Sequence, residues 1–133
     1  MIVIESSAMV DVLVADPVNP ELVAAVSGQP LHAPALLDFE VASALRGRIL
    51  GRKLEHSRLD TAIADFQGVD VRRHRMTRFL PQILDLRDNF TTYDAAYVVL
   101  AKVLNAPLIT TDAKMKVAEK AGVEVRILRS GDM

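Results

Sequence analysis

The sequence predicts an α/β fold in which helices cover both faces of a parallel sheet. Two observations carry this prediction: short β-type segments alternate along the chain with longer segments of helical spacing, and Gly or Pro stands at many of the boundaries. Strands that alternate with helices form parallel sheets, because each strand must be reached through a crossover. The 133 residues contain no internal repeat, low-complexity segment or linker, so we expect a single domain over residues 1–133.

Short apolar segments rich in β-branched residues predict the strands. In chain order they are Ile2–Ile4, Pro30–Ala33, Val69–Arg72, Pro107–Thr110 and Glu124–Leu128. Apolar residues recurring every three or four positions predict the helices. In chain order these are Ser7–Val14, Pro20–Ser27, Ala35–Leu50, Ser57–Phe66, Met76–Asp88, Thr92–Leu104 and Ala113–Ala121. Asn19-Pro20 before the second helix and Gly122 after the last are typical boundary signals.

The composition excludes several classes of protein. Half of the residues are apolar and a quarter are charged, which is typical of a globular protein. The longest apolar run, Ala95–Ala101, is far shorter than the roughly 20 residues of a membrane span, and no signal peptide precedes the first strand. Without cysteine there is no disulfide framework or thiolate metal site. We therefore expect a cytoplasmic protein without a membrane partner.

Two carboxylates follow predicted strands. Glu5 comes directly after Ile2–Ile4, and Asp112 comes just after Pro107–Thr110. Parallel α/β sheets bind ligands beyond the carboxyl ends of their strands, so these side chains are candidate site residues. Asp112 is equally well explained as a helix N-cap, whereas Glu is a poor N-cap and Ser6 or Ser7 could fill that position. Capping therefore explains Glu5 poorly.

Two further carboxylates lie on predicted helices. Glu40 shares its helix face with apolar and small residues, where an unpaired charge is costly unless a cation such as Arg46 pairs with it. Asp94 lies in the first turn of the next-to-last helix, after a Thr that can cap it, and leads an apolar stripe. Carboxylates brought together repel unless a cation holds them, and a hard ion such as Mg²⁺, or alternatively Mn²⁺, suits oxygen ligands. An all-carboxylate site of this kind indicates phosphate chemistry.

Four stretches together resemble the PIN-domain ribonucleases, and within them the VapC-type toxins of type II toxin–antitoxin pairs. They are "VIESSAMVD", "PALLDFEVASALRGR", "TTYDAAYVVLA" and "LITTDAKM", in the family's order and spacing over nearly the whole chain. The resemblance implies a three-layer α/β/α sandwich with a five-stranded parallel sheet. It also implies a metal-dependent endoribonuclease that hydrolyses RNA phosphodiester bonds, a homodimer and a small antitoxin that occludes the site.

The resemblance assigns roles by position. Glu40, Asp94 and Asp112 match the acidic residues of the family, and Glu5 stands where the family usually has Asp. The four would be the catalytic residues and the ligands of Mg²⁺ or Mn²⁺. A further set would line the site, namely Ser7, Thr110 and Asn89. Since octahedral Mg²⁺ tolerates little error in its ligands, the longer Glu5 predicts weaker binding or a preference for Mn²⁺.

RNA needs positive charge beside an acidic centre, and a net charge of −1 supplies no global attraction. Arg46, on the helix of Glu40, is the first candidate for RNA binding. Arg46 belongs to one of two basic clusters, which taken alone suit a solvated surface and matter only if they flank the acids. The first cluster is Arg46, Arg48, Arg52, Lys53 and Arg58, and the second, a weaker candidate, is Arg72, Arg73, His74, Arg75 and Arg78. The histidines fall in unrelated segments, which argues against a histidine acid–base pair.

Two alternatives stay open at this level. A phosphoacceptor receiver domain needs paired acids after the first strand, an Asp ending the third strand and a Lys ending the last, which "VIESS", "VDVRRH" and "VRILRS" do not supply. A degenerate PIN domain would bind RNA or a protein partner without cleavage, because Glu5 replaces the usual Asp.

Overall fold

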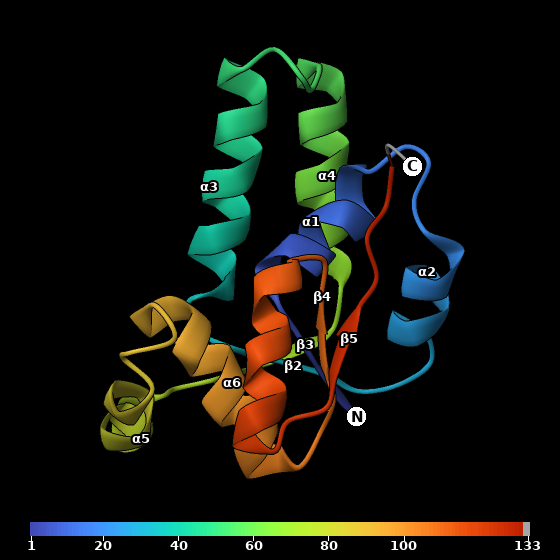
Figure 1. The fold of residues 1–133 in the computed structure, drawn as a ribbon. Helices are drawn as coiled ribbons and strands as arrows, with labels where there is room; N and C mark the ends of the chain where they lie inside the picture. Colours follow the sequence, from blue (N-terminus) through green and yellow to red (C-terminus); the bar gives the residue numbers. More distant parts are fainter. Residues whose placement is uncertain (132–133) are drawn as a thin grey trace.

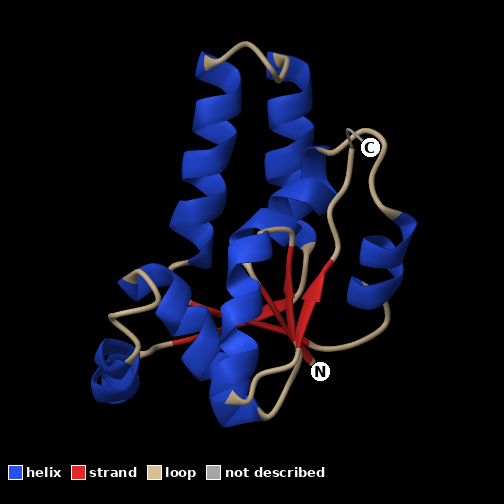
Figure 2. Cartoon of the chain, in the orientation of Figure 1, coloured by secondary structure: helices blue, strands red, loops and turns tan. Residues whose placement is uncertain are grey.

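A computed structural model describes residues 1–131, and its centre is a five-stranded, all-parallel sheet. Its spatial order is β3-β2-β1-β4-β5. The strands are β1 (Ile2–Ile4), β2 (Leu31–Pro34), β3 (Val71–His74), β4 (Leu108–Thr110) and β5 (Val125–Ile127). Figure 2 shows them side by side in the middle of the molecule. The predicted strands are confirmed, with small shifts at their ends.

Helices connect the strands in two groups. The α-helices are α1 (Ser6–Val14), α2 (Pro20–Val26), α3 (Leu37–Leu50), α4 (His56–Gly68), α5 (Leu80–Asp85) and α6 (Thr92–Leu104). Two 3₁₀ segments complete them, η1 (Thr77–Phe79) and η2 (Ala113–Ala121). From β1 the chain steps outward through β2 to β3, then returns past β1 to β4 and β5. Because crossovers are right-handed, the two directions place their helices on opposite faces, which gives the predicted three layers.

The segment Met76–Asp88 differs from its prediction as one helix. The structure has the 3₁₀ turn η1, then the short helix α5, then a turn from Leu86 to Phe90. Pro81 lies in the first turn of α5, where the absence of an N–H costs nothing, so the α-helix begins next to it. The prediction of a continuous helix was wrong because Pro81 acts as a start signal inside the apolar pattern.

Helix α6 is the most deeply buried helix. Every residue of Ala95–Ala101 is buried, because α6 contacts β1, β2 and β4 on one side and α5 on the other. The longest apolar run of the sequence therefore forms the buried part of a helix in the core. Among residues 1–131, no helix combines the length and the apolarity that crossing a membrane requires.

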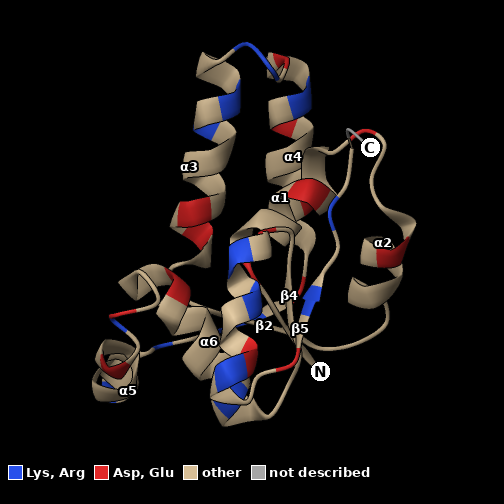
Figure 3. Ribbon diagram, viewed as in Figure 1, with Lys and Arg blue, Asp and Glu red and all other residues tan. Residues whose placement is uncertain are grey.

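The hairpin of α3 and α4 extends away from the sheet (Figure 1). Lys and Arg colour the outer part of this hairpin, whereas α3 carries acidic residues at the end nearest the sheet (Figure 3). Those acidic residues are Asp38 and Glu40 in the first turn of α3. The hairpin therefore joins a basic tip to an acidic base at the sheet edge.

Candidate active site at the carboxyl edge of the sheet

The site begins where β1 and β4 end side by side. These strands pair in register, with Val3 opposite Leu108 and Ile4 opposite Ile109, and the Glu5 N–H donates to the Ile109 carbonyl at 2.9 Å. The chain leaves β1 toward one edge of the sheet and leaves β4 toward the other, so this is the point at which the topology reverses. Parallel α/β sheets form ligand crevices at such a point.

Glu5 is buried, with 6% of its surface exposed, and its carboxylate accepts hydrogen bonds at both oxygens. Oε2 accepts from the Ser6 hydroxyl at 2.7 Å and from the Ser7 N–H at 3.0 Å. Oε1 accepts from the Thr110 hydroxyl at 2.7 Å and also from the Ser7 hydroxyl. Glu5 is therefore the N-cap of α1, and the expectation that capping poorly explains this residue was wrong. The extra methylene lets the carboxylate bend back to the helix terminus while reaching across to β4.

Thr110 and Ser7 connect this carboxylate to the start of the next segment. The Thr110 hydroxyl accepts from the Asp112 N–H at 3.0 Å, and the Ser7 hydroxyl accepts from the Thr111 N–H at 3.1 Å. Both hydroxyls thus donate to Glu5 and accept from the backbone after β4. The two predicted hydroxyl positions lie directly beside Glu5.

Glu40 is held by a tyrosine that sequence reasoning placed only on an apolar stripe. The buried Tyr97 of α6 donates its hydroxyl proton to Glu40 Oε1 at 2.7 Å. Burial raises the pKa of Glu40, and the negative charges of Glu5 and Asp94 raise this pKa further, while the hydrogen bond from Tyr97 opposes the rise. This mutual influence brings Glu5, Glu40 and Asp94 into one electrostatic centre.

Lys114 lies between the two remaining acids. Its Nζ is 3.3 Å from Asp94 Oδ2 and 3.5 Å from Asp112 Oδ2. The carboxylate of Asp94, and then that of Asp112, raises the pKa of Lys114. Both acids also lie at helix N-termini. Asp112 is the N-cap of η2, and Asp94 lies in the first turn of α6, after the N-cap Thr91. The capping interpretation of Asp112 is correct and does not conflict with its place beside Asp94.

The chemistry of these donors fits a hard divalent cation, because all four are carboxylates. The ammonium of Lys114 between Asp94 and Asp112 shows that this point accepts a cation. Within residues 1–131, no three Asp, Glu or His side chains already surround a common point. A metal ion bound by Asp94 and Asp112 would have to displace Lys114 from these two carboxylates.

Two predicted residues lie outside this centre. Asn89 is exposed in the turn between α5 and α6, where its N–H donates to the Leu86 carbonyl. Arg46 is exposed on α3, about 1.7 helical turns beyond Glu40, and among the described residues it forms no ion pair with Glu40. The pairing considered for Glu40 is thus made by Tyr97 and not by Arg46.

Tyr97 and Lys114 are the site residues that sequence reasoning missed. Tyr97 carries the one hydroxyl in the run Ala95–Ala101, and a buried tyrosine hydroxyl usually finds a partner, so its signal was present. Lys114 lies in "TTDAKM" without any pattern that indicates its contact with Asp94. Its role depends on a helix from a different part of the chain.

Two histidines from segments far apart in the sequence, His32 and His74, are in direct contact. His32 Nδ1 and His74 Nε2 are 2.8 Å apart, across the neighbouring strands β2 and β3. Burial and nearby positive charge lower the pKa of both rings. No local pattern in the sequence indicates this contact, which forms because β3 returns beside β2 after the α3–α4 hairpin.

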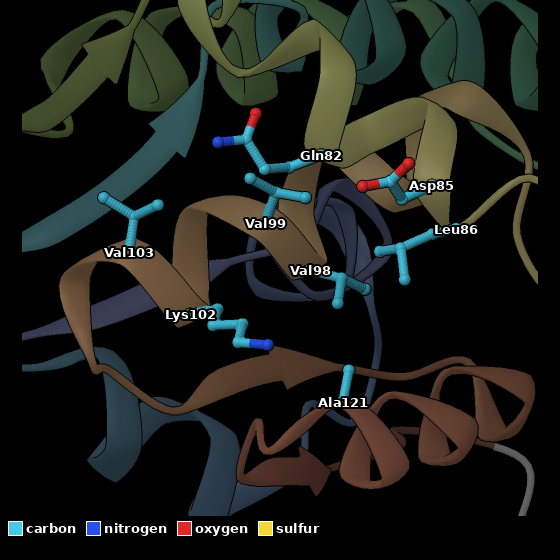
Figure 4. Close-up of a pocket in the computed structure, with 8 residues that line it drawn as sticks. All are labelled: Gln82, Asp85, Leu86, Val98, Val99, Lys102, Val103 and Ala121. Atoms are coloured by element: carbon cyan, nitrogen blue, oxygen red, sulfur yellow. The ribbon is translucent and has the colours of Figure 1, made fainter.

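An apolar hollow of about 330 Å³ lies elsewhere, between α5, α6 and the end of η2. Figure 4 shows its lining, which is Gln82, Asp85, Leu86, Val98, Val99, Lys102, Val103 and Ala121. None of the four clustered acids lines it. The charged centre and this hollow are therefore separate features.

The family model for the PIN domain matches residues 2–121 of this chain, a range that includes all four acids. The chain belongs to the PIN-domain family. It is 30% identical over 128 residues to Ribonuclease VapC12 of Mycobacterium tuberculosis, which covers 96% of this chain and 99% of that protein. It is 31% identical over 128 residues to Ribonuclease VapC9 of the same organism, covering 96% and 98%. Ribonuclease VapC3 of that organism is 34% identical over 115 residues, covering 86% and 84%.

Membership of the PIN family agrees with the architecture built above. The resemblance that rested on four short stretches is confirmed as a VapC-type PIN relationship over nearly the full length of the chain. The predicted sandwich with a five-stranded parallel sheet is confirmed as well.

Proposed function

We propose that this PIN-domain protein is an endoribonuclease and the toxin of a toxin–antitoxin pair, with activity that depends on Mg²⁺ or Mn²⁺. The observation that supports the proposal is the pair of electrostatic links beside the reversal of the sheet: the charges of Glu5 and Asp94 act on Glu40, and Lys114 contacts both Asp94 and Asp112. Relatives of similar length that bear the name ribonuclease support it. The antitoxin, the RNA substrate and a homodimer are the partners that this function implies.

The residues around the acids have distinct tasks in this proposal. Asp94 and Asp112 would hold the ion together with Glu40 and Glu5, and the bound ion would supply an activated water for attack on phosphorus. Tyr97 fixes the position of Glu40 by its hydrogen bond, and Thr110 with Ser7 fixes that of Glu5. Because water is the nucleophile, no side chain has to form a covalent intermediate.

Basic side chains must bring an RNA strand to this negative centre. Arg46 remains a proposed contact, since its helix begins beside Glu40 and carries it outward along the α3–α4 hairpin. A contact between its guanidinium and a phosphate oxygen would contribute affinity and not sequence preference.

Cleavage of RNA by Asp94→Asn tests the proposal. This change keeps the size of the side chain but removes its charge, so we expect a loss of more than about 100-fold in cleavage rate, because even outer partners of metal ligands cost about 10–100-fold. The matched control is Asp60→Asn on the exposed face of α4, for which we expect the wild-type rate. The substrate is a structured RNA incubated with Mg²⁺, with Mn²⁺ or with EDTA.

Equal cleavage by wild type and Asp94→Asn would overturn the assignment of the site. Cleavage that persists in EDTA would overturn the metal dependence alone. Thermal unfolding of both variants shows whether a lost rate reflects a lost fold.

A further inference from the structure

A basic hollow lies at the carboxyl end of β3. It has a volume of about 520 Å³, and its lining is Arg73, His74, Arg75, Thr77 and Arg78. None of these lining residues is acidic. We call this surface the β3-end hollow.

Arg73 is already committed to a structural contact. Its Nε lies 2.8 Å and 3.0 Å from the two carboxylate oxygens of Asp38, and its guanidinium lies 5.6 Å from the ring centroid of Phe66. These contacts fix the wall of the hollow to the first turn of α3. Arg73 therefore forms part of the wall of the hollow, and its positive charge is balanced by the carboxylate of Asp38.

Arg75 and Arg78 are differently placed. Both are exposed, and within residues 1–131 neither forms an ion pair. The guanidinium of Arg78 stacks over Phe79 at 4.8 Å from the ring centroid, which orients it without neutralising it. Burial, together with the charges of Arg72 and Arg78, lowers the pKa of His74, so the positive charge of the hollow belongs to its arginines.

The hollow shares an edge of the sheet with the acidic centre. All five strands are parallel, and β3 is separated from β1 by β2 alone, which places the two strand ends about 10 Å apart at the usual strand spacing. The first turn of α3 connects them: Asp38 holds Arg73, Glu40 belongs to the acidic centre, and the Ala35 N–H donates to the His74 carbonyl at 2.9 Å. A few nucleotides of a single strand suffice to cover both features.

An exposed aromatic ring lies on the same turn. Phe39, between Asp38 and Glu40 in the chain, is 80% exposed. Exposed aromatic rings beside basic grooves serve as stacking platforms for bases of single-stranded nucleic acids. The combination of free guanidinium groups and an exposed ring along one edge suits a nucleic-acid strand better than an isolated small anion.

We propose that the β3-end hollow binds a backbone phosphate of the RNA strand through Arg75 and Arg78 and thereby guides that strand into the acidic centre. The inference rests on the proposed ribonuclease function and adds a binding site to it. Guanidinium groups suit this task because their planar N–H pairs match phosphate oxygens and stay charged at all accessible pH values.

Binding of a fluorescein-labelled single-stranded RNA of mixed sequence tests this site by fluorescence anisotropy in EDTA. The variant is the double substitution Arg75→Ala and Arg78→Ala. Its matched control is Arg126→Ala with Arg129→Ala, which removes the same charge from exposed positions at and beyond β5, on the opposite edge of the sheet. A second variant, Arg75→Lys with Arg78→Lys, keeps the charge but loses the planar geometry.

We expect the Arg75/Arg78 alanine variant to raise the dissociation constant about tenfold. Its slope of log affinity against log salt should become shallower by about 0.7, the value for one lost phosphate contact with a single strand. The lysine variant should keep the wild-type salt slope, and the control should keep both values. Equal losses in the alanine variant and its control would overturn the proposal, because net charge alone would then explain them.

Inorganic phosphate added as a competitor separates the two sources of the ligand. If the hollow held only free phosphate, the alanine variant would lose phosphate binding while keeping RNA affinity, which would overturn the proposal. EDTA also keeps this binding test independent of the proposed catalysis. If RNA binding depends on Arg75 and Arg78 but the protein cleaves no RNA in the separate assay with Mg²⁺ or Mn²⁺, the nuclease function is refuted and the binding role of the hollow is not.

Discussion

The hydrogen bond between Tyr97 and Glu40 gives a prediction whose magnitude follows from the geometry. Tyr97→Phe removes a hydroxyl that donates to Glu40 Oε1 at 2.7 Å, while the buried ring keeps its volume. A hydrogen bond to a charged group contributes about 1.5–3 kcal/mol. We therefore expect the free energy of unfolding to fall by about 2 kcal/mol at pH 8, which is well above the ordinary pKa of a glutamate.

The effect should depend on pH in a definite direction. Burial raises the pKa of Glu40 in the folded protein above its unfolded value, so the folded state binds this proton more tightly. Stability from this group is thus present at low pH and is lost as pH rises through the folded pKa. Tyr97 stabilises the ionised form and limits that loss. As pH falls and Glu40 becomes protonated, the cost of Tyr97→Phe should shrink toward the roughly 0.5–1.5 kcal/mol of a neutral hydrogen bond.

Urea unfolding followed by far-UV circular dichroism, in EDTA at several pH values from 8 to 5, measures both effects. The control is Tyr93→Phe, one turn earlier on α6, where the side chain is 64% exposed. An exposed substitution of this kind should change stability by no more than about 0.5 kcal/mol. The reasoning is refuted if Tyr97→Phe is as mild as Tyr93→Phe at pH 8, or if its cost is the same at every pH.

Three further changes probe the site and the core. Glu5→Asp should change the free energy of unfolding by less than about 1 kcal/mol, since Asp is the better N-cap but reaches less far across the sheet. It should tighten Mn²⁺ binding measured by calorimetry, and unchanged affinity and cleavage would contradict the view that the extra methylene matters. Lys114→Met should also tighten Mn²⁺ binding, because it frees two carboxylates from an ammonium group, whereas Lys116→Met removes only a pair with Glu119 at 3.1 Å and should have no effect. Equal Mn²⁺ affinities for the two lysine variants would argue against this competition. Ile109→Ala in the fully buried β4 should cost about 2–5 kcal/mol in urea unfolding, and a loss below about 1 kcal/mol would be inconsistent with its central position.

The amino-acid sequence alone determined most of the strands and helices and the carboxylates that are candidate site residues. Strand and helix signals are local, since they depend on residue periods and on turn residues within a few positions. The position of Glu5 and Asp112 after strands is local too, and parallel strands bring such residues to one edge in whatever order the strands lie. The wrong prediction of one continuous helix over Met76–Asp88 also concerns local signals. It followed the apolar spacing and did not use Pro81 as a helix start signal.

Only the tertiary structure decided which side chains meet. Tyr97 reaches Glu40 across 57 positions of sequence, and Lys114 meets Asp94 because α6 and η2 lie on the same side of the sheet. His32 meets His74 because β3 pairs with β2. These contacts depend on strand order and on the handedness of the crossovers, which act through the whole chain and leave no mark in a short window of sequence. The surroundings of Glu5 have both origins, since its carboxylate accepts from Ser6 and Ser7 at the start of its own helix and from Thr110 of β4, far away in the sequence.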